Sequence, residues 1–212
     1  ITFVRGSDIY RSNADGTDIV NLTNLTMGIC EDPAFSPDGN FITFRSSSPG
    51  NYEIYRMTTT GTNITRLTTA AGTDEYPVYS PNGSKIVFVS DRDGNQEIYT
   101  MNSDGTGQVR LTNNTFRDSE PAFSPDGTKI VFNRGVNGNF GPWQVFTMNS
   151  ADGSSPLQIT SPAQTILDMT PSYSPDGTKI IFTRYDTGPF TSVFITVNTD
   201  GSGATTLPLT GF

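Results

Sequence analysis

The sequence predicts an all-β protein, a β-propeller of about five four-stranded blades whose first blade lacks its inner strand within the chain. Three observations support this fold. A turn motif of the form aromatic-Ser-Pro-Asp/Asn-Gly recurs along the chain, and short segments of β-forming residues follow each copy. No segment shows sustained helical periodicity. Composition agrees, because 21 glycines and 14 prolines accompany only 16% charged residues.

The turn motif sets the period of the repeat. Its copies lie at 35–39, 79–83, 123–127 and 173–177, which gives two intervals of 44 residues and one of 50. Proline presets φ and glycine supplies a positive φ, so each copy predicts a tight turn. The turn joins one strand, A, to the next strand, B. The extra residues of the last interval fall around Gly135 to Trp143.

Strands B, C and D follow each turn in the same order. Strand B has the sequences FITF (41–44), KIVF (85–88 and 129–132) and KIIF (179–182), with ITFV (1–4) as a fifth copy. Strand C and its turn cover 8–17, 53–62, 97–106, 144–154 and 193–202. Strand D closes on a threonine at 21–23, 66–68, 110–112, 158–160 and 208–210. We expect one domain over 1–212, with units at about 1–30, 31–73, 74–117, 118–167 and 168–212.

These motifs resemble a known repeat. The sequence PAFSPDGTKIVF, followed by a glycine-rich turn and EIYTMNSDGTGQVRLT, resembles the TolB-type (WD40-like) β-propeller repeat over nearly the whole chain, best at 71–134. The resemblance implies that strand A lines a central channel. Proteins of the TolB group usually carry six blades, whereas this chain carries five B, C and D strands and four A strands. The repeat serves in periplasmic scaffolds, peptidase gating domains and bacterial surface proteins, so it predicts function only broadly.

Charge and hydropathy exclude two classes of partner. The formal net charge is −8 and no cluster of Lys and Arg is present, so we expect no nucleic-acid binding. No apolar stretch is long enough to span a bilayer, so we expect no membrane insertion. The single cysteine, Cys30, is expected to be a buried, inert thiol. The chain begins ITFVRG without an initiator methionine, and we expect that it was processed or excised.

Catalytic motifs are missing, and the prediction is that the protein is not an enzyme. The chain has no histidine, which excludes a Ser-His-Asp triad, a Cys-His pair and an imidazole metal ligand. It also lacks a Gly-x-Ser-x-Gly elbow and a phosphate-cradling loop. A carboxylate pair could cleave a glycosidic bond, but every acid considered belongs to the repeat.

Acidic residues gather just before each strand A. If strand A lines a channel, they would surround one mouth of it and bind a cationic peptide or a metal ion such as Ca²⁺; no other cofactor is expected. The alternative is that they cap strands and keep the entrance hydrated. The candidate binding residues are Asp32, Asp74, Glu75, Asp118, Glu120 and Asp168, and the candidate metal ligands are Asp74, Asp118 and Asp168.

Arginines recur at the end of strand B. Arg5, Arg134 and Arg184 lie two residues after the repeat phenylalanine, whereas Arg45 lies one residue after it. These guanidinium groups could face an acidic partner. The favoured prediction is that they pair with acids of the neighbouring blade.

Two further sets of residues are candidates for contact or modification. Phe140 and Trp143 lie in the insertion, where an aromatic side chain either contacts a partner or packs across the loop base. Gly211 and Phe212 lie where the next strand A would begin. If the protein is exported, N-glycosylation is predicted at Asn21, Asn24, Asn63, Asn82 and Asn113.

Two functions remain open from the sequence. The leading hypothesis is a non-enzymatic interaction or structural propeller outside the cytoplasm: extracellular, at the cell surface or periplasmic. Its partner would be a protein, and the hypothesis includes a second copy of the chain, because a vacant strand position is a template for pairing and a heterologous contact propagates into a homo-polymer. The alternative is a monomeric ligand- or peptide-binding propeller domain cut from a larger protein, with cation binding at the acidic channel mouth.

Overall fold

The computed structural model describes residues 1–24, 27–48, 50–136 and 142–207. The chain divides into two compact units. Unit 1 comprises Ile1–Gly94 and Tyr99–Arg110, and unit 2 comprises Asn95–Ile98 and Leu111–Phe212. All described elements are β-strands, and the described residues include no helix that could span a membrane.

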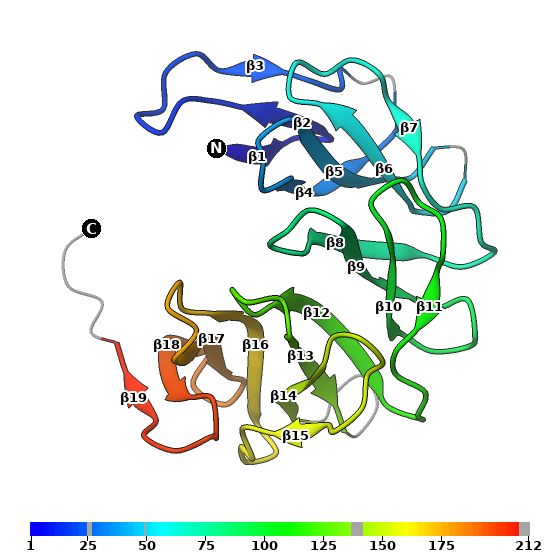
Figure 1. Ribbon diagram of the computed structural model, residues 1–212. Coiled ribbons are helices and arrows are strands. Elements are labelled where there is room, and N and C mark those ends of the chain that lie inside the picture. The colour runs from blue at the N-terminus through cyan, green and yellow to red at the C-terminus, as the bar shows by residue number, and fades with distance from the viewer. Residues whose placement is uncertain (25–26, 49, 137–141, 208–212) are drawn as a thin grey trace. The chain divides into compact units, whose positions relative to one another are not determined.

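Three of the sheets belong to the first part of the chain (Figure 1). Blade 1 has three antiparallel strands, in the order β1-β2-β3. Blades 2 and 3 have four strands each, in the orders β4-β5-β6-β7 and β8-β9-β10-β11. The strands are β1 Thr2–Arg5, β2 Asp8–Arg11, β3 Val20–Asn21, β4 Cys30–Phe35, β5 Phe41–Ser46, β6 Glu53–Thr58, β7 Thr65–Arg66, β8 Asp74–Tyr79, β9 Lys85–Ser90, β10 Glu97–Asn102 and β11 Val109–Arg110.

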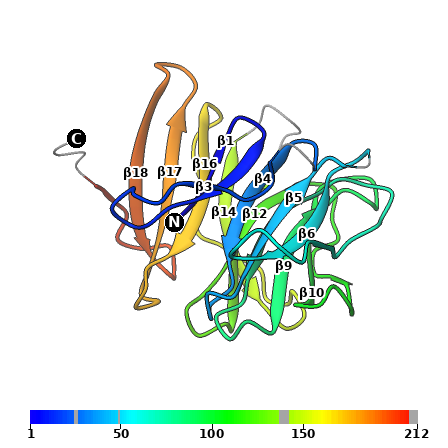
Figure 2. The same ribbon diagram turned by 90° about the horizontal axis from the view of Figure 1, so that it is seen from above.

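Blades 4 and 5 lie in unit 2 and share one eight-stranded sheet. Blade 4 comprises β12 Arg117–Phe123, β13 Lys129–Gly135, β14 Trp143–Asn149 and β15 Leu157–Gln158. Blade 5 comprises β16 Ile166–Tyr173, β17 Lys179–Asp186, β18 Thr191–Asn198 and β19 Thr205–Thr206. A single parallel pair, Trp143 with Leu167, joins β14 to β16. Figure 2 shows β16, β17 and β18 running side by side, as their antiparallel pairing requires.

Each strand B supplies the centre of its blade. The repeat phenylalanines Phe44, Phe88, Phe132 and Phe182 are at most 1% exposed. Phe44, Phe88 and Phe182 pack against strand C of the same blade and against the previous blade. In unit 1, Ile54 and Leu67 of blade 2 join Ile86 and Phe88 of blade 3 in one buried cluster. The same pattern holds between blades 4 and 5 in unit 2, so within each unit the core consists of apolar layers between neighbouring blades.

The inner strands begin earlier than predicted. The acids expected before strand A lie within it, because strand A continues past the repeat proline by means of a β-bulge. In each inner strand the register with strand B shifts across the bulge, and the residue before the proline has a positive φ: 54° at Asp32, 53° at Tyr76, 51° at Glu120 and 51° at Thr170. Proline has no backbone N–H and cannot donate a hydrogen bond to strand B, and the bulge accommodates it at this point. The residues before the bulge remain paired with strand B.

A close approach between blades explains the glycine of the strand C–D turn. Gly105 has φ +90°, and a Cβ there would lie 2.8 Å from the carbonyl oxygen of Leu67 on the previous blade. Gly16 of blade 1 has a similar φ of +80°, but nothing described lies within 4 Å of its Cβ position. The turn therefore needs glycine for its conformation in every blade, and at Gly61, Gly105, Gly153 and Gly201 also because the carbonyl of the previous blade leaves no room for a Cβ.

The predicted fold class is confirmed, and so is the missing inner strand of blade 1 among the described residues. The assignment to a single domain remains a prediction. For blade 5 the predicted strand D at 208–210 lies outside the described residues, and the described strand D is β19, at Thr205–Thr206. Leu207 follows it and donates its amide to the Phe194 carbonyl, as Leu22 does to Ile9 and Leu67 to Ile54.

Candidate functional site

The predicted metal ligands lie in three buried ion pairs, each within one blade. Asp118 lies opposite Arg134 in the β12–β13 register, and its two carboxylate oxygens accept from Nε at 2.6 Å and Nη2 at 2.7 Å. Asp168 binds Arg184 in the same way across β16–β17. Asp74 lies opposite Ser90, and Arg92 reaches it from two residues further on. The prediction that these arginines bind acids of the neighbouring blade is therefore wrong for Arg134 and Arg184.

Burial governs the electrostatics of these pairs. The three carboxylates are 0% exposed. Burial raises the pKa of Asp74 and of Asp118, while hydrogen bonds and the nearby guanidinium oppose the rise. Among the described residues no group of three or more Asp, Glu, Cys or His could hold a metal ion. Asp74, Asp118 and Asp168 are each paired with an arginine of the same blade. This arrangement does not support the predicted metal site.

Blade 2 carries a neutral version of this pair. Cys30 stands where the other blades have aspartate, and Ser46 lies opposite it in the register. Cys30 is 0% exposed, as predicted, and burial raises the pKa of its thiol. The loss of the acid and of the opposing arginine together avoids an unpaired charge in the core.

Arg45 lies one residue earlier along strand B than Arg134 does, and its side chain therefore points to the other face of the sheet. There it contacts Glu31 at 2.6 Å and Asp32 at 3.0 Å within blade 2, and Glu75 of blade 3 at 3.0 Å. Its guanidinium also lies 4.5 Å from the ring centroid of Tyr52. For Arg45, the predicted contact with the neighbouring blade is confirmed. The candidate binding residues Asp32 and Glu75 are brought together here by an internal cation.

Asp32 and Glu120 also bind the backbone at the bulge of the next blade. Tyr76 is the bulge residue of the next blade. Its backbone amide donates a hydrogen bond of 3.3 Å to an Asp32 carboxylate oxygen. In unit 2, Glu120 accepts the amide of the bulge residue Thr170 at 2.6 Å. These contacts tie successive inner strands together, a role that the predicted binding site did not include.

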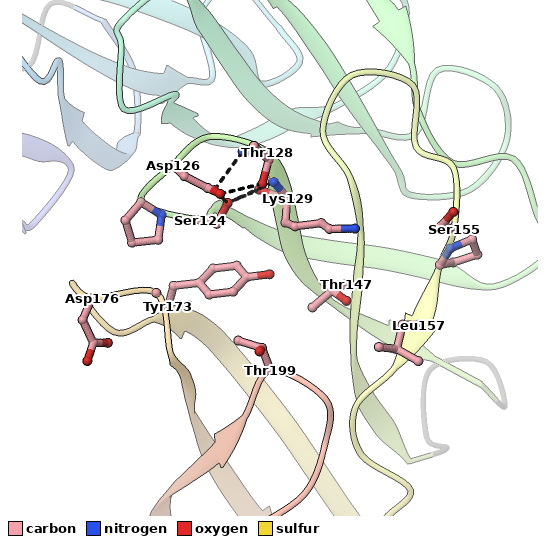
Figure 3. A pocket seen from close by; sticks show the side chains of 13 residues that line it. Ser124, Asp126, Thr128, Lys129, Thr147, Ser155, Leu157, Tyr173, Asp176 and Thr199 are labelled. Atoms are coloured by element: carbon pink, nitrogen blue, oxygen red, sulfur yellow. Dashed lines mark hydrogen bonds between the residues drawn. The ribbon is translucent and has the colours of Figure 1, made fainter.

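A groove opens between two neighbouring blades in each unit. The groove in unit 2 has a volume of about 780 Å³ and contains Tyr173, Asp126, Asp176 and Lys129. Figure 3 shows the Tyr173 ring pointing into it, below the turn that carries Ser124 and Asp126. The equivalent groove in unit 1, lined by Tyr79, has about 410 Å³. Burial raises the pKa of both tyrosines to about 12, so both phenols are protonated at neutral pH.

The turn beside the unit 2 groove offers a direct electrostatic test. Asp126 accepts the Ser124 hydroxyl, and this bond is the largest cause that lowers its pKa to about 2. Ser124→Ala is expected to return the Asp126 pKa toward the ordinary aspartate value of 3.8. Because the folded-state pKa lies below the unfolded value, the stabilisation is present above pH 3.8 and is lost as the pH falls through about 2. Carboxyl ¹³C shifts measured against pH check this, and an unchanged pKa would refute the assigned cause.

Blade 1 exposes a face that the other blades bury. In blade 2, Ile42, Phe44 and Tyr55 pack in one cluster with Ile9 and Leu22 of blade 1. Their counterparts in blade 1 are Ile1, Phe3 and Tyr10. Ile1 is 59% exposed, and the rings of Phe3 and Tyr10 stack at 5.7 Å, much as Phe44 and Tyr55 stack at 5.8 Å. We call Ile1, Phe3, Tyr10 and the open side of β1 the receiving face.

Blade 5 exposes the complementary positions. Ile9, Ile54 and Val145 project from strand C onto the next blade and are each 0% exposed. Phe194 occupies the same register position in blade 5 and is 41% exposed. Leu207, which follows strand D as Leu22 and Leu67 do, is 36% exposed. We call Phe194 and Leu207 the projecting face. Sequence reasoning predicted the vacant strand position beside β1, but it missed the side chains of both faces, because they show only when exposure is compared between equivalent positions.

Of the other predicted contact residues, only Trp143 is described. Trp143 is half-buried in β14, where it pairs with Gly135 and Leu167. Phe140, Gly211 and Phe212 lie outside the described residues. The sequon residues Asn24, Asn63, Asn82 and Asn113 are exposed, whereas Asn21 is half-buried and donates its amide nitrogen to Asp8 and Tyr10. Glycosylation remains a prediction.

Comparison with known proteins gives a consistent result. A structure assigned as TolB from Agrobacterium tumefaciens is 27% identical, with a TM-score of 0.83 over 97% of this chain and 75% of that one. TolB from Acinetobacter baumannii is 28% identical, with a TM-score of 0.79 over 96% of this chain and 49% of that one. The chain thus spans about three quarters of one and half of the other. The Nidogen/Laminin complex matches at 17% identity, with a TM-score of 0.73 over 94% of this chain and 71% of that one, which indicates the fold alone.

The other two comparisons were made with curated proteins and with models of protein families. A search of curated proteins found no match. The family profile of the TolB beta propeller domain matches residues 4–212, nearly the entire sequence. The repeat motifs, the four-stranded blades and this match lead to one conclusion: the chain belongs to the TolB beta-propeller domain family.

Proposed function

We propose that this chain is a non-enzymatic protein-interaction propeller that associates with copies of itself. The receiving face of blade 1 in one copy takes the projecting face of blade 5 in the next. Such a contact joins two different surfaces, so it propagates from copy to copy. An extracytoplasmic location, extracellular, at the cell surface or periplasmic, is part of the proposal and rests on the family resemblance.

The observation that carries the proposal is that both faces are less buried than their counterparts in the other blades: Ile1, Phe194 and Leu207 are exposed, and Phe3 and Tyr10 are half-buried. Within the chain, a residue of strand C and the one that follows strand D pack onto the strand B and C side chains of the following blade. The pairs that do so are Ile9 with Leu22, Ile54 with Leu67, and Val145 with Ile159. Phe194 and Leu207 repeat the projecting half of this contact, and Ile1, Phe3 and Tyr10 repeat the receiving half. Burying the two together would extend the kind of apolar layer that these three clusters of described residues already form.

The edge of β1 supports the same contact. Ile1 and Ser12 exchange both backbone hydrogen bonds, at 2.9 Å each, so the amides that bond β2 are those of Ile1, Phe3 and Arg5. The amides of Thr2 and Val4 therefore face the edge where the other blades carry strand A. An unpaired edge of this kind accepts an added strand.

Val4→Pro tests the proposal at this edge. The substitution removes an amide that faces the open edge and leaves the β1–β2 ladder intact, so it should abolish self-association while the blade remains folded. Val4→Ala removes the side chain and retains the amide, and it should associate more than Val4→Pro. Sedimentation velocity gives the size distribution, and circular dichroism checks the fold. Equal association by the proline and alanine variants would contradict strand addition at β1.

No observation favours catalysis over binding. The carboxylates whose pKa burial raises at the inner strands of blades 3 and 4, Asp74 and Asp118, are closed off from solvent and bonded to arginines. Two structural neighbours are a puromycin-hydrolysing peptidase and a puromycin hydrolase, each at 14% identity, which indicates a shared fold alone. The alternative of cation binding at Asp32, Asp74, Glu75, Asp118, Glu120 and Asp168 remains an untested prediction.

A further inference from the structure

The grooves in the two units are equivalent by register, which permits a residue-by-residue comparison. In unit 1, Arg56 lies opposite Thr43 and lines the groove beside Tyr79. In unit 2, Thr147 lies opposite Val131, at the same register position, and lines the groove beside Tyr173. Phe41 of unit 1 corresponds likewise to Lys129 of unit 2, and Asn82 corresponds to Asp176.

A guanidinium occupies the unit 1 groove. Arg56 Cζ lies 4.6 Å from the ring centroid of Phe41. Its Nη1 donates to the carbonyl oxygen of Ser103, on the turn after strand C of the next blade, at 2.8 Å. The side chain thus spans the groove from one blade to the next, between an aromatic ring and a backbone acceptor. It leaves Tyr79 only 7% exposed.

The unit 2 groove lacks this guanidinium and carries more negative charge. Thr147 is too short to cross it, and its volume is nearly twice as large, at about 780 against about 410 Å³. Lys129 donates to Asn149 at 2.6 Å, so its ammonium has an internal partner. Asp126 and Asp176 both line the groove, whereas unit 1 has Asp38 and the neutral Asn82 there.

We propose that the unit 2 groove binds the guanidinium group of an arginine side chain supplied by a partner protein. The arginine would lie against the Tyr173 ring, and Asp126 and Asp176 would attract its charge. Thr199 corresponds to Ser103, because each directly follows the last residue of its strand C, and its carbonyl offers the same acceptor. The chain itself shows this chemistry at Arg56. The proposal is independent of self-association, because neither the receiving face nor the projecting face lies in this groove.

The test uses the peptide acetyl-Gly-Arg-Gly-amide and the 212-residue chain. The expected result is a saturable shift of the Tyr173 and Asp176 amide resonances in two-dimensional NMR, with a millimolar dissociation constant that rises with salt. The same peptide with glutamine in place of arginine should cause no saturable shift, and the lysine peptide should bind several-fold more weakly. No saturable shift with the arginine peptide, or equal binding by the lysine or glutamine peptide, would overturn the proposal.

Two variants make the test specific to the groove. Thr147→Arg combined with Lys129→Phe copies the Arg56 and Phe41 pair into unit 2, and it should reduce peptide affinity at least tenfold. Asp176→Asn copies Asn82, exchanges one exposed side chain and should weaken binding several-fold without unfolding the chain. An unchanged peptide affinity in Asp176→Asn would show that the peptide binds elsewhere. An unchanged affinity in the folded double variant would show the same.

Discussion

Arg134→Met is expected to lower the free energy of unfolding by about 3–5 kcal/mol, because it leaves the Asp118 carboxylate buried without its cation. Asp118 is 0% exposed and accepts two hydrogen bonds from Arg134, so solvent cannot replace the lost partner. Methionine keeps most of the volume of the arginine stem, which limits any packing loss. Urea denaturation followed by circular dichroism measures the change in midpoint at constant slope.

Two controls separate charge from packing. Arg5→Met changes the arginine at the same repeat position in blade 1, where the side chain is exposed and no strand A lies opposite, and it should change stability by less than about 0.5 kcal/mol. Arg134→Met combined with Asp118→Leu removes both charges and should recover most of the loss. If Arg134→Met cost as little as Arg5→Met, the buried pair would not contribute as described.

Gly105→Ala is expected to destabilise the chain by about 2–5 kcal/mol, from about 1–2 for a side chain at positive φ and about 1–3 for overpacking. The added methyl would lie 2.8 Å from the Leu67 carbonyl oxygen and 3.1 Å from its Cα, both of which are backbone atoms. The strand C–D turn of blade 3 and strand D of blade 2 would have to separate. Thermal and urea unfolding measure the loss.

Gly16→Ala is the matched control. Gly16 occupies the same Asp-Gly-Thr turn with φ +80°, and nothing described lies within 4 Å of its Cβ position. It should therefore cost only the conformational term, about 1–2 kcal/mol. The difference between the two variants gives the contribution of the contact between blades. Equal losses would mean that the glycine serves the turn alone.

The sequence was sufficient for the fold because its local signals agree. Each Ser-Pro-Asp-Gly turn, each β-rich segment and the constant spacing favour the same four-stranded unit. The buried phenylalanines and Cys30 were also predictable, since they recur at, or replace, fixed repeat positions. The beginning of strand A was not, because the repeat proline argues against a strand unless a bulge is anticipated.

The candidate sites were less predictable, for two physical reasons. Whether an arginine contacts its own blade or the next depends on strand parity, and a shift of one residue sends Arg45 and Arg134 to opposite faces. Exposure also depends on what covers a residue. Ile54 and Phe194 occupy the same position in their blades, yet they are 0% and 41% exposed. The groove beside Tyr173 arises in the same way, from Thr147 in place of an arginine.

The mass of the chain in solution, measured by light scattering over a range of concentrations, tests the central claim most directly. Self-association through blades 1 and 5 predicts a mass that rises with concentration above the 22.9 kDa of one chain. Phe194→Asp should return the mass to that of one chain, whereas Phe190→Asp, at a 75% exposed hairpin position outside the projecting face, should not. A mass of 22.9 kDa for the unmodified chain at every concentration would contradict the account.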